Sequence, residues 1–86
     1  MPVLIRHRHP GMSLDDYDEI SPPIVAKLKE QPGFVVHVAF MDNGVFTVSE
    51  IWESQEQHDR WFDENVRPNV PEMQQEVVEV HKVHQP

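Results

Sequence analysis

The residue pair with the clearest potential for acid–base chemistry in this sequence is His37 and Glu50, which flank Asn43-Gly44. Asn-Gly between two runs of β-forming residues favours a two-residue hairpin turn, because both turn positions adopt positive φ. Counting back from such a turn along both strands places His37 directly opposite Glu50. Opposed side chains in antiparallel strands have Cβ atoms about 5 Å apart, so an imidazole–carboxylate contact is feasible.

This pair has two interpretations. In the functional one, Glu50 orients His37, and the imidazole acts as a general base or hydrogen-bonds a substrate. In the structural one, the two side chains form a satisfied polar pair that fixes the strand register, since buried polar groups need partners. Both depend on the turn, because a three-residue turn would put the two side chains on opposite faces of the sheet.

Four further residues are predicted to contact a substrate on the same face of the sheet. A tyrosine hydroxyl can donate to a ligand, and tryptophan rings can stack on a planar molecule. The alternatives are helix-face packing for the tyrosine and plain core packing for the tryptophans. The predicted substrate-binding residues are Tyr17, Trp52, His58 and Trp61.

A second group of histidines has a spacing that suits a metal ion. His7 and His9 lie on one side of a predicted strand, and a third ligand could come from His81 or His84 near the C-terminus. The alternative is a strand end that carries exposed histidines. No cysteine or spaced set of carboxylates adds to these ligands, so we expect neither a metal nor another cofactor.

The first helical region contains a proline pair. Ser13 is typical of a helix N-cap, and acidic residues follow it where the helix dipole favours them. Proline in a helix interior costs about 3 kcal/mol, whereas a first turn tolerates it. Pro22-Pro23 therefore predicts two short helices, one over 14–20 and one over about 22–30.

The second helical region begins at Ser54, with Gln57 completing a capping-box pattern. Pro68 and Pro71 are expected to end this helix. Its apolar side has helical spacing and is predicted to face the sheet. The residues of this inner stripe are His58, Trp61, Phe62 and Val66.

Four segments have the composition or the period of two that is typical of strands, at residues 2–9, 34–41, 45–53 and 77–84. With the helices between them, the order is strand, helix, strand, strand, helix, strand. Short connections and right-handed crossovers fold this order most simply into a ferredoxin-like split βαβ sheet. We expect a single α+β domain over 1–86, with a four-stranded antiparallel sheet, two helices on one face, and the first and third strands central.

The second strand predicts a homodimer. Two helices can cover only one face of the sheet, yet residues 34–41 are apolar on both faces except at His37. A solvated face would show polar residues at every second position. The uncovered face is expected to pack against the sheet of a second copy. The outward set is predicted to be Phe34, Val36, Val38 and Phe40.

Composition excludes several classes of function. The formal net charge is −8, and only seven residues are lysine or arginine, which argues against nucleic-acid binding. No apolar run approaches the roughly 18 residues that a membrane span needs. The absence of cysteine fits a reducing compartment, so we expect a cytoplasmic protein.

Two short motifs carry a resemblance to a known family. The turn Gln31-Pro32-Gly33-Phe34 and the segment Glu50-Ile51-Trp52-Glu53-Ser54 make the chain resemble the antibiotic-biosynthesis monooxygenase-like group of dimeric α+β barrels. The resemblance implies two ferredoxin-like subunits packed sheet to sheet, each with a pocket between sheet and helices. Some members oxidise phenolic or quinol substrates with oxygen and no cofactor, others degrade haem, and many have no known activity.

One position departs from the family. Members often carry a pocket histidine about nine residues after the aromatic that matches Trp52; here Trp61 occupies that place, and His58 lies one turn earlier. The resulting hypothesis is a dimeric small-molecule-binding domain that acts as a cofactor-independent monooxygenase on a phenolic or quinol-like aromatic substrate. The alternative is a non-catalytic dimeric module that binds a metabolite or a partner protein.

Overall fold

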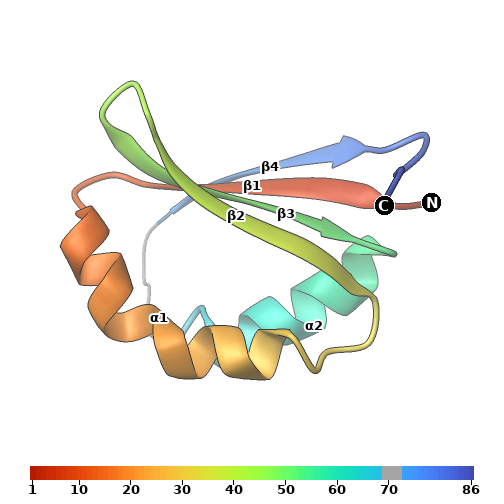
Figure 1. Ribbon diagram of the computed structural model, residues 1–86, viewed down its shortest axis with the longest axis horizontal. Coiled ribbons are helices and arrows are strands. Elements are labelled where there is room, and N and C mark those ends of the chain that lie inside the picture. Colours follow the sequence, from red (N-terminus) through yellow and green to blue (C-terminus); the bar gives the residue numbers. More distant parts are fainter. Residues whose placement is uncertain (69–72) are drawn as a thin grey trace.

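A single four-stranded antiparallel sheet with both helices on one face forms the architecture of this protein (Figure 1). The structure, a computed structural model, describes residues 1–68 and 73–86. The strand order β2-β3-β1-β4 confirms the predicted ferredoxin-like arrangement with the first and third strands central. The elements are β1 (Val3–His9), α1 (Leu14–Leu28), β2 (Phe34–Asp42), β3 (Val45–Trp52), α2 (Gln55–Asn65) and β4 (Gln74–Glu79).

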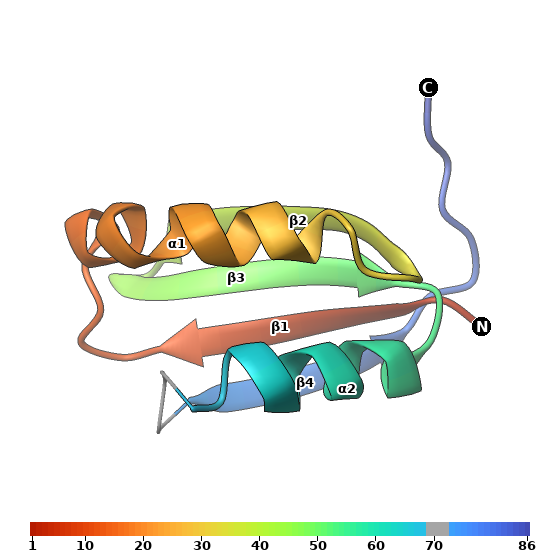
Figure 2. The same cartoon turned by 90° about the horizontal axis from the view of Figure 1, so that it is seen from below.

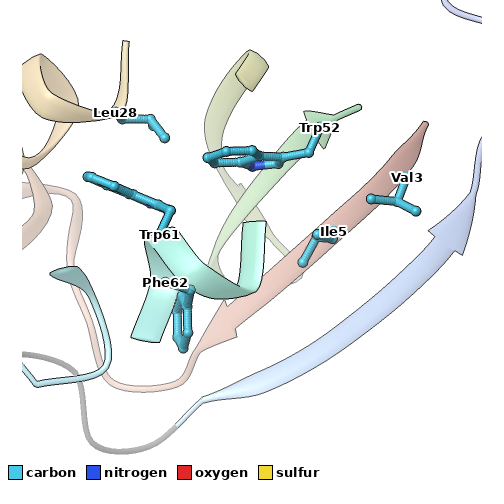
Figure 3. Packing of buried hydrophobic residues seen from close by; sticks show 6 residues of the cluster. All are labelled: Val3, Ile5, Leu28, Trp52, Trp61 and Phe62. Atoms are coloured by element: carbon cyan, nitrogen blue, oxygen red, sulfur yellow. The ribbon is translucent and has the colours of Figure 1, made fainter. Parts of the chain in front are cut away.

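The core lies between the sheet and the two helices. Alternate residues of β1 are buried on the helix side, as its period of two predicts. Leu28 from α1, Trp61 from α2 and Trp52 from β3 gather above them (Figure 3). These side chains are at most 2% exposed, so the two aromatic rings and the leucine hold both helices on the same face.

The β2–β3 hairpin has the predicted two-residue turn. Asn43 has φ 50° and Gly44 has φ 80°, the left-handed region that such turns require. The register pairs Asp42 with Val45 and, five residues further along each strand, His37 with Glu50. The turn residues therefore fix which side chains share the helix-facing side.

A bulge near the start of β2 changes the side on which Phe34 lies. The register shifts between Phe34 and Val36, so Phe34 pairs with Trp52. The two rings are in edge-to-face contact with centroids 5.6 Å apart. The prediction that Phe34 faces outward with Val36 and Val38 was wrong, because the extra residue reverses the alternation at this point.

Helix α1 is one helix from Leu14 to Leu28, although two were predicted. Pro22 and Pro23 lie inside it, and the helix bends part-way along (Figure 1). Prolines cannot donate to the carbonyls four residues earlier, which belong to Asp18 and Glu19. Both of those residues are exposed, so water can satisfy the freed carbonyls and the helix continues through a bend instead of ending.

Helix α2 begins after Ser54, whose hydroxyl accepts from the backbone N–H of Gln57. The reciprocal half of the capping box is absent, because the Gln57 side chain bonds the Ser54 hydroxyl rather than its backbone. The helix ends at Asn65, before Pro68; Pro71 lies outside the described residues. In the described ranges, neither helix is long and apolar enough to cross a membrane.

Strand β4 occupies Gln74–Glu79 and not the predicted 77–84. It pairs with β1 so that Val3 faces Glu79, and the last contact is the Val80 N–H donating to the Pro2 carbonyl at 2.9 Å. Strand β1 begins at Val3, and Val80 is therefore the last residue of this edge that is paired. The chain beyond Val80 leaves the sheet (Figure 2).

Candidate functional site

His37 links a buried carboxylate to a tyrosine hydroxyl. Its Nδ1 lies 2.6 Å from Glu50 Oε2, and its Nε2 lies 2.7 Å from the Tyr17 hydroxyl. A carboxylate only accepts hydrogen bonds, so Nδ1–H donates to Glu50. When the ring is neutral, its Nε2 lone pair accepts from the Tyr17 O–H. The predicted contact between His37 and Glu50 is present, and Tyr17 extends it across the cavity to α1.

The start of α1 positions Tyr17. The Ser13 hydroxyl accepts from the Asp16 N–H at 3.0 Å, and the Asp16 carboxylate accepts from the Ser13 N–H at 3.1 Å, which completes a capping box. The Tyr17 ring then packs on Phe46 of β3, with centroids 4.8 Å apart. Local capping and one aromatic contact therefore aim the hydroxyl at His37.

Glu50 is held as a carboxylate although it is only 4% exposed. Burial by itself would raise its pKa, but hydrogen bonds from His37 and from the Trp52 indole, together with the nearby imidazoles, hold the pKa below its usual value. The indole Nε1–H donates to Oε1 at 3.0 Å. Each carboxylate oxygen thus has a donor, and the ionised form is stabilised in the core.

Tyr17 remains a protonated donor. Burial raises the pKa of its hydroxyl, the hydrogen bond with Ser21 opposes this shift, and the charges of Glu50 and Asp18 reinforce it. A tyrosine with a raised pKa keeps its proton at neutral pH. The hydroxyl therefore supplies the hydrogen bond that His37 Nε2 accepts.

A cavity open to solvent lies between α1, α2 and the sheet. The space between its walls is about 560 Å³ including the open part, and about 70 Å³ of it can hold the centre of a water-sized sphere. Its polar lining residues are His7, His9, Tyr17, Ser21, His37 and Glu50. Apolar residues such as Ile24, Leu28, Phe46, Val48, Trp61 and Val66 form most of the remaining wall.

The predicted site residues divide between the cavity wall and its support. Trp61 lines the cavity together with the Tyr17–His37–Glu50 chain. Trp52 is fully buried beneath Glu50, and His58 is buried beside Trp52 with ring centroids 5.7 Å apart. Neither of these two lines the cavity, so they support residues that do.

His58 connects a second cavity residue to the surface. Its Nε2 lies 3.1 Å from His7 Nε2, and its Nδ1 lies 2.9 Å from the half-exposed Asp59 carboxylate. Burial lowers the pKa of His7 to about 4, against the opposing attraction of Glu50. His7 is therefore neutral at physiological pH.

The metal alternative loses its third ligand. His7 and His9 share a face as predicted, but both are buried rather than exposed. The residue of β4 opposite His7 is Gln75, and the predicted ligands His81 and His84 lie beyond the sheet. Within residues 1–68 and 73–86, no group of three or more metal-ligating side chains is present.

His7 and His9 line the cavity, although they were predicted only as possible metal ligands. Both follow Val3 and Ile5 on the same side of β1. Their place in the alternation with two core residues is the signal that could have identified them as cavity-lining side chains.

Comparisons with solved structures identify the fold. The protein Rv0793 from Mycobacterium tuberculosis superposes with a TM-score of 0.77 at 12% identity, over 99% of this chain and 100% of that one. SnoaB, a cofactor-independent oxygenase from Streptomyces nogalater, superposes with a TM-score of 0.65 at 10% identity, over 95% and 94%. An antibiotic biosynthesis monooxygenase gives 0.54 at 17%, over 98% and 100%.

The fold is that of the antibiotic biosynthesis monooxygenases. The structural agreement covers nearly the whole of each chain, whereas no family model and no curated protein sequence matches this one. The resemblance that the sequence motifs predict is therefore confirmed in the backbone. Sequence identities of 10–17% show a shared fold but do not show a shared activity.

The neutral burial of His7 makes stability depend on pH. The unfolded chain binds a proton near pH 6.5 and the folded chain near pH 4, so folding stability falls as pH falls through this window. We expect His7 to contribute a loss of about 2 kcal/mol between pH 7.5 and pH 5. Denaturant unfolding at several pH values should show a shallower pH dependence for His7→Gln than for the wild type.

His81→Gln provides the control, since the exposed His81 should leave the pH dependence unchanged. All three proteins are compared at one concentration. A His7→Gln variant with the same pH dependence as the wild type would contradict the neutral, buried state of His7.

Proposed function

We propose that this protein is a homodimeric, cofactor-independent monooxygenase for a phenolic or quinol-like aromatic substrate. The observation that carries the proposal is the Tyr17–His37–Glu50 hydrogen-bond chain, which opens into a largely apolar cavity. A fold shared with SnoaB, itself a cofactor-independent oxygenase, supports the same class of reaction.

His37 acts as the general base. A substrate hydroxyl replaces or joins the Tyr17 hydroxyl at Nε2 and gives its proton to the imidazole. The proton on Nδ1 stays between His37 and Glu50, and the carboxylate stabilises the imidazolium that forms. The low pKa of Glu50 suits this role, because the carboxylate must be ionised before the reaction begins.

The deprotonated ring then reduces molecular oxygen. In the conversion of a phenol to a quinone, the ring gives up four electrons: one oxygen atom becomes the new carbonyl and the other leaves as water. The phenolic proton and the displaced ring hydrogen both end in that water, so no further reductant is needed. The apolar walls, including Trp61 and Phe46, hold the electron-rich ring next to oxygen and away from bulk water.

A non-catalytic dimeric module is the second candidate. It is favoured by the small space inside the cavity, about 70 Å³ for water-sized spheres, and by the contact that already occupies His37 Nε2. In this case the cavity binds a metabolite, and the His37–Glu50 pair fixes the strand register and hydrogen-bonds the metabolite.

The outer face of the sheet supports the homodimer. The register aligns one apolar residue from each strand into a row across the sheet, and in β1 this residue alternates with those buried on the helix side. Val36 is 38% exposed and Val78 is 52% exposed, and Val38 extends the patch. A second copy of the same face would bury this row. The row consists of Val36, Ile51, Leu4 and Val78.

The oxygenase proposal predicts oxygen uptake that depends on His37. With a panel of phenols and quinols in an oxygen electrode, the wild type should consume oxygen with at least one class. His37→Ala should slow this uptake by about 100-fold, because the base is lost. His81→Ala is the matched control and should retain full uptake, since His81 is exposed beyond the sheet.

Unchanged oxygen uptake in His37→Ala would show that His37 is not the general base. No uptake by the wild type across the panel, combined with saturable binding of the same compounds, would favour the non-catalytic module instead.

The dimer proposal predicts a mass of twice the 10.1-kDa chain by light scattering after size exclusion at micromolar concentration. Val36→Glu should give a monomer, because the interface would bury a charge without a partner. Val77→Glu is the control: Val77 is similarly exposed, at 41%, but lies on the opposite side of β4 from Val78. A wild-type monomer, or a Val36→Glu dimer as stable as the wild type, is incompatible with the proposal.

A further inference from the structure

His9 is a buried imidazole with one ring nitrogen that has no hydrogen-bond partner. It is 7% exposed, and its Nδ1 is the only fully buried side-chain polar atom in the described residues without a partner. The other histidines of the cavity, His7 and His37, are hydrogen-bonded. Leaving a buried polar group without a partner destabilises a fold, so such a group in a cavity wall points to a ligand that completes it.

The neighbouring His7 offers the complementary group. The Asp59 carboxylate accepts from His58 Nδ1–H, and with His58 neutral its Nε2 lone pair accepts from His7 Nε2–H. The remaining nitrogen of His7, Nδ1, is then an acceptor. Its ring lies 6.3 Å from that of His9, nearly perpendicular to it.

We propose that His7 and His9 form a second polar subsite of the cavity, which binds a ligand hydroxyl group. The hydroxyl donates to the acceptor nitrogen of His7 and accepts from an N–H of His9. This inference rests on the proposed function and narrows its substrate class. The substrate is an aromatic molecule with two hydroxyl groups, one at Tyr17–His37 and the other at His7–His9.

The sheet register gives the separation of the two subsites. His37 pairs with Glu50 and His7 with Val48, so the two histidines are two residues apart along the strands and two strands apart across the sheet. Standard strand spacings put their Cα atoms roughly 12 Å apart, and those of His37 and His9 roughly 16 Å. Phe46 and Val48 line the cavity between them, so the ligand is polar at both ends and apolar in its middle.

The charge of the subsite selects a hydroxyl over a carboxylate. Burial lowers the pKa of His9, as it does that of His7, so both rings are neutral at physiological pH. A bound carboxylate would meet no formal positive charge there and would be repelled by Glu50, whose charge acts on His7. A neutral hydroxyl has no such cost.

Three naphthalene probes test the subsite. Binding of 2-naphthol, 2,6-dihydroxynaphthalene and 6-hydroxy-2-naphthoate is measured by quenching of tryptophan fluorescence and by NMR titration at pH 7.5. The wild type should bind the dihydroxy compound about tenfold more tightly than 2-naphthol, because only it satisfies His9. The carboxylate should gain nothing over 2-naphthol.

His9→Phe is the decisive variant. It should bind 2-naphthol and the dihydroxy compound equally, while its melting temperature without ligand is unchanged or higher, because a buried unpartnered nitrogen has been removed. A residue with a purely structural role would lower the melting temperature and leave the preference intact. Tyr17→Phe is the comparison at the other subsite and should weaken both compounds by similar factors.

The proposed subsite is wrong if the wild type shows no preference for the second hydroxyl, or if His9→Phe keeps that preference. It is also wrong if neither naphthol binds. A preference for the second hydroxyl without oxygen uptake would support the His7–His9 subsite and contradict the oxygenase proposal. Oxygen uptake without this preference would support the oxygenase proposal and contradict the subsite.

Discussion

The contact between His37 and Glu50 is the interaction on which the rest of the site depends. It joins the edge strand β2 to the central strand β3 and requires a turn of two residues, which Asn43-Gly44 supplies at positive φ. A shift of one residue would carry His37 to the outer face and leave Oε2 of Glu50 in the core without the His37 donor. The register of the β2–β3 hairpin therefore determines both the ionised state of Glu50 and whether His37 can act on a ligand in the cavity.

Two further side chains, Tyr17 from α1 and Trp52 from β3, bond to this pair. The capping box of α1 directs the Tyr17 hydroxyl to Nε2 of His37, and the Trp52 indole donates to Oε1 of Glu50. Helix α1 continues through its proline pair, so one helix carries both Tyr17 at the cavity and Leu28 in the core. The polar chain is therefore built into the apolar core, where its hydrogen bonds act in a low dielectric.

The strand order and the hairpin register follow from the sequence because turn residues and alternation are local signals. The inner side of α2 also follows from the sequence, because its helical spacing is visible within eleven residues. The bulge at Phe34 and the continuity through Pro22-Pro23 depend on tertiary context: a partner ring in the first case, and the solvent exposure of Asp18 and Glu19 in the second. The missing hydrogen-bond partner of His9 Nδ1 depends on which side chains reach it in the folded protein, and no pattern along the chain reports that.

The hydrogen-bond state of His37 in the free protein is the most direct test of the account, because a base must present a lone pair to the cavity. Nitrogen-15 NMR of the imidazole at pH 8 distinguishes the two neutral tautomers. We predict a proton on Nδ1, shared with Glu50, and an unprotonated Nε2 facing Tyr17. A proton on Nε2 instead would contradict it, since that nitrogen could then accept no proton from a substrate.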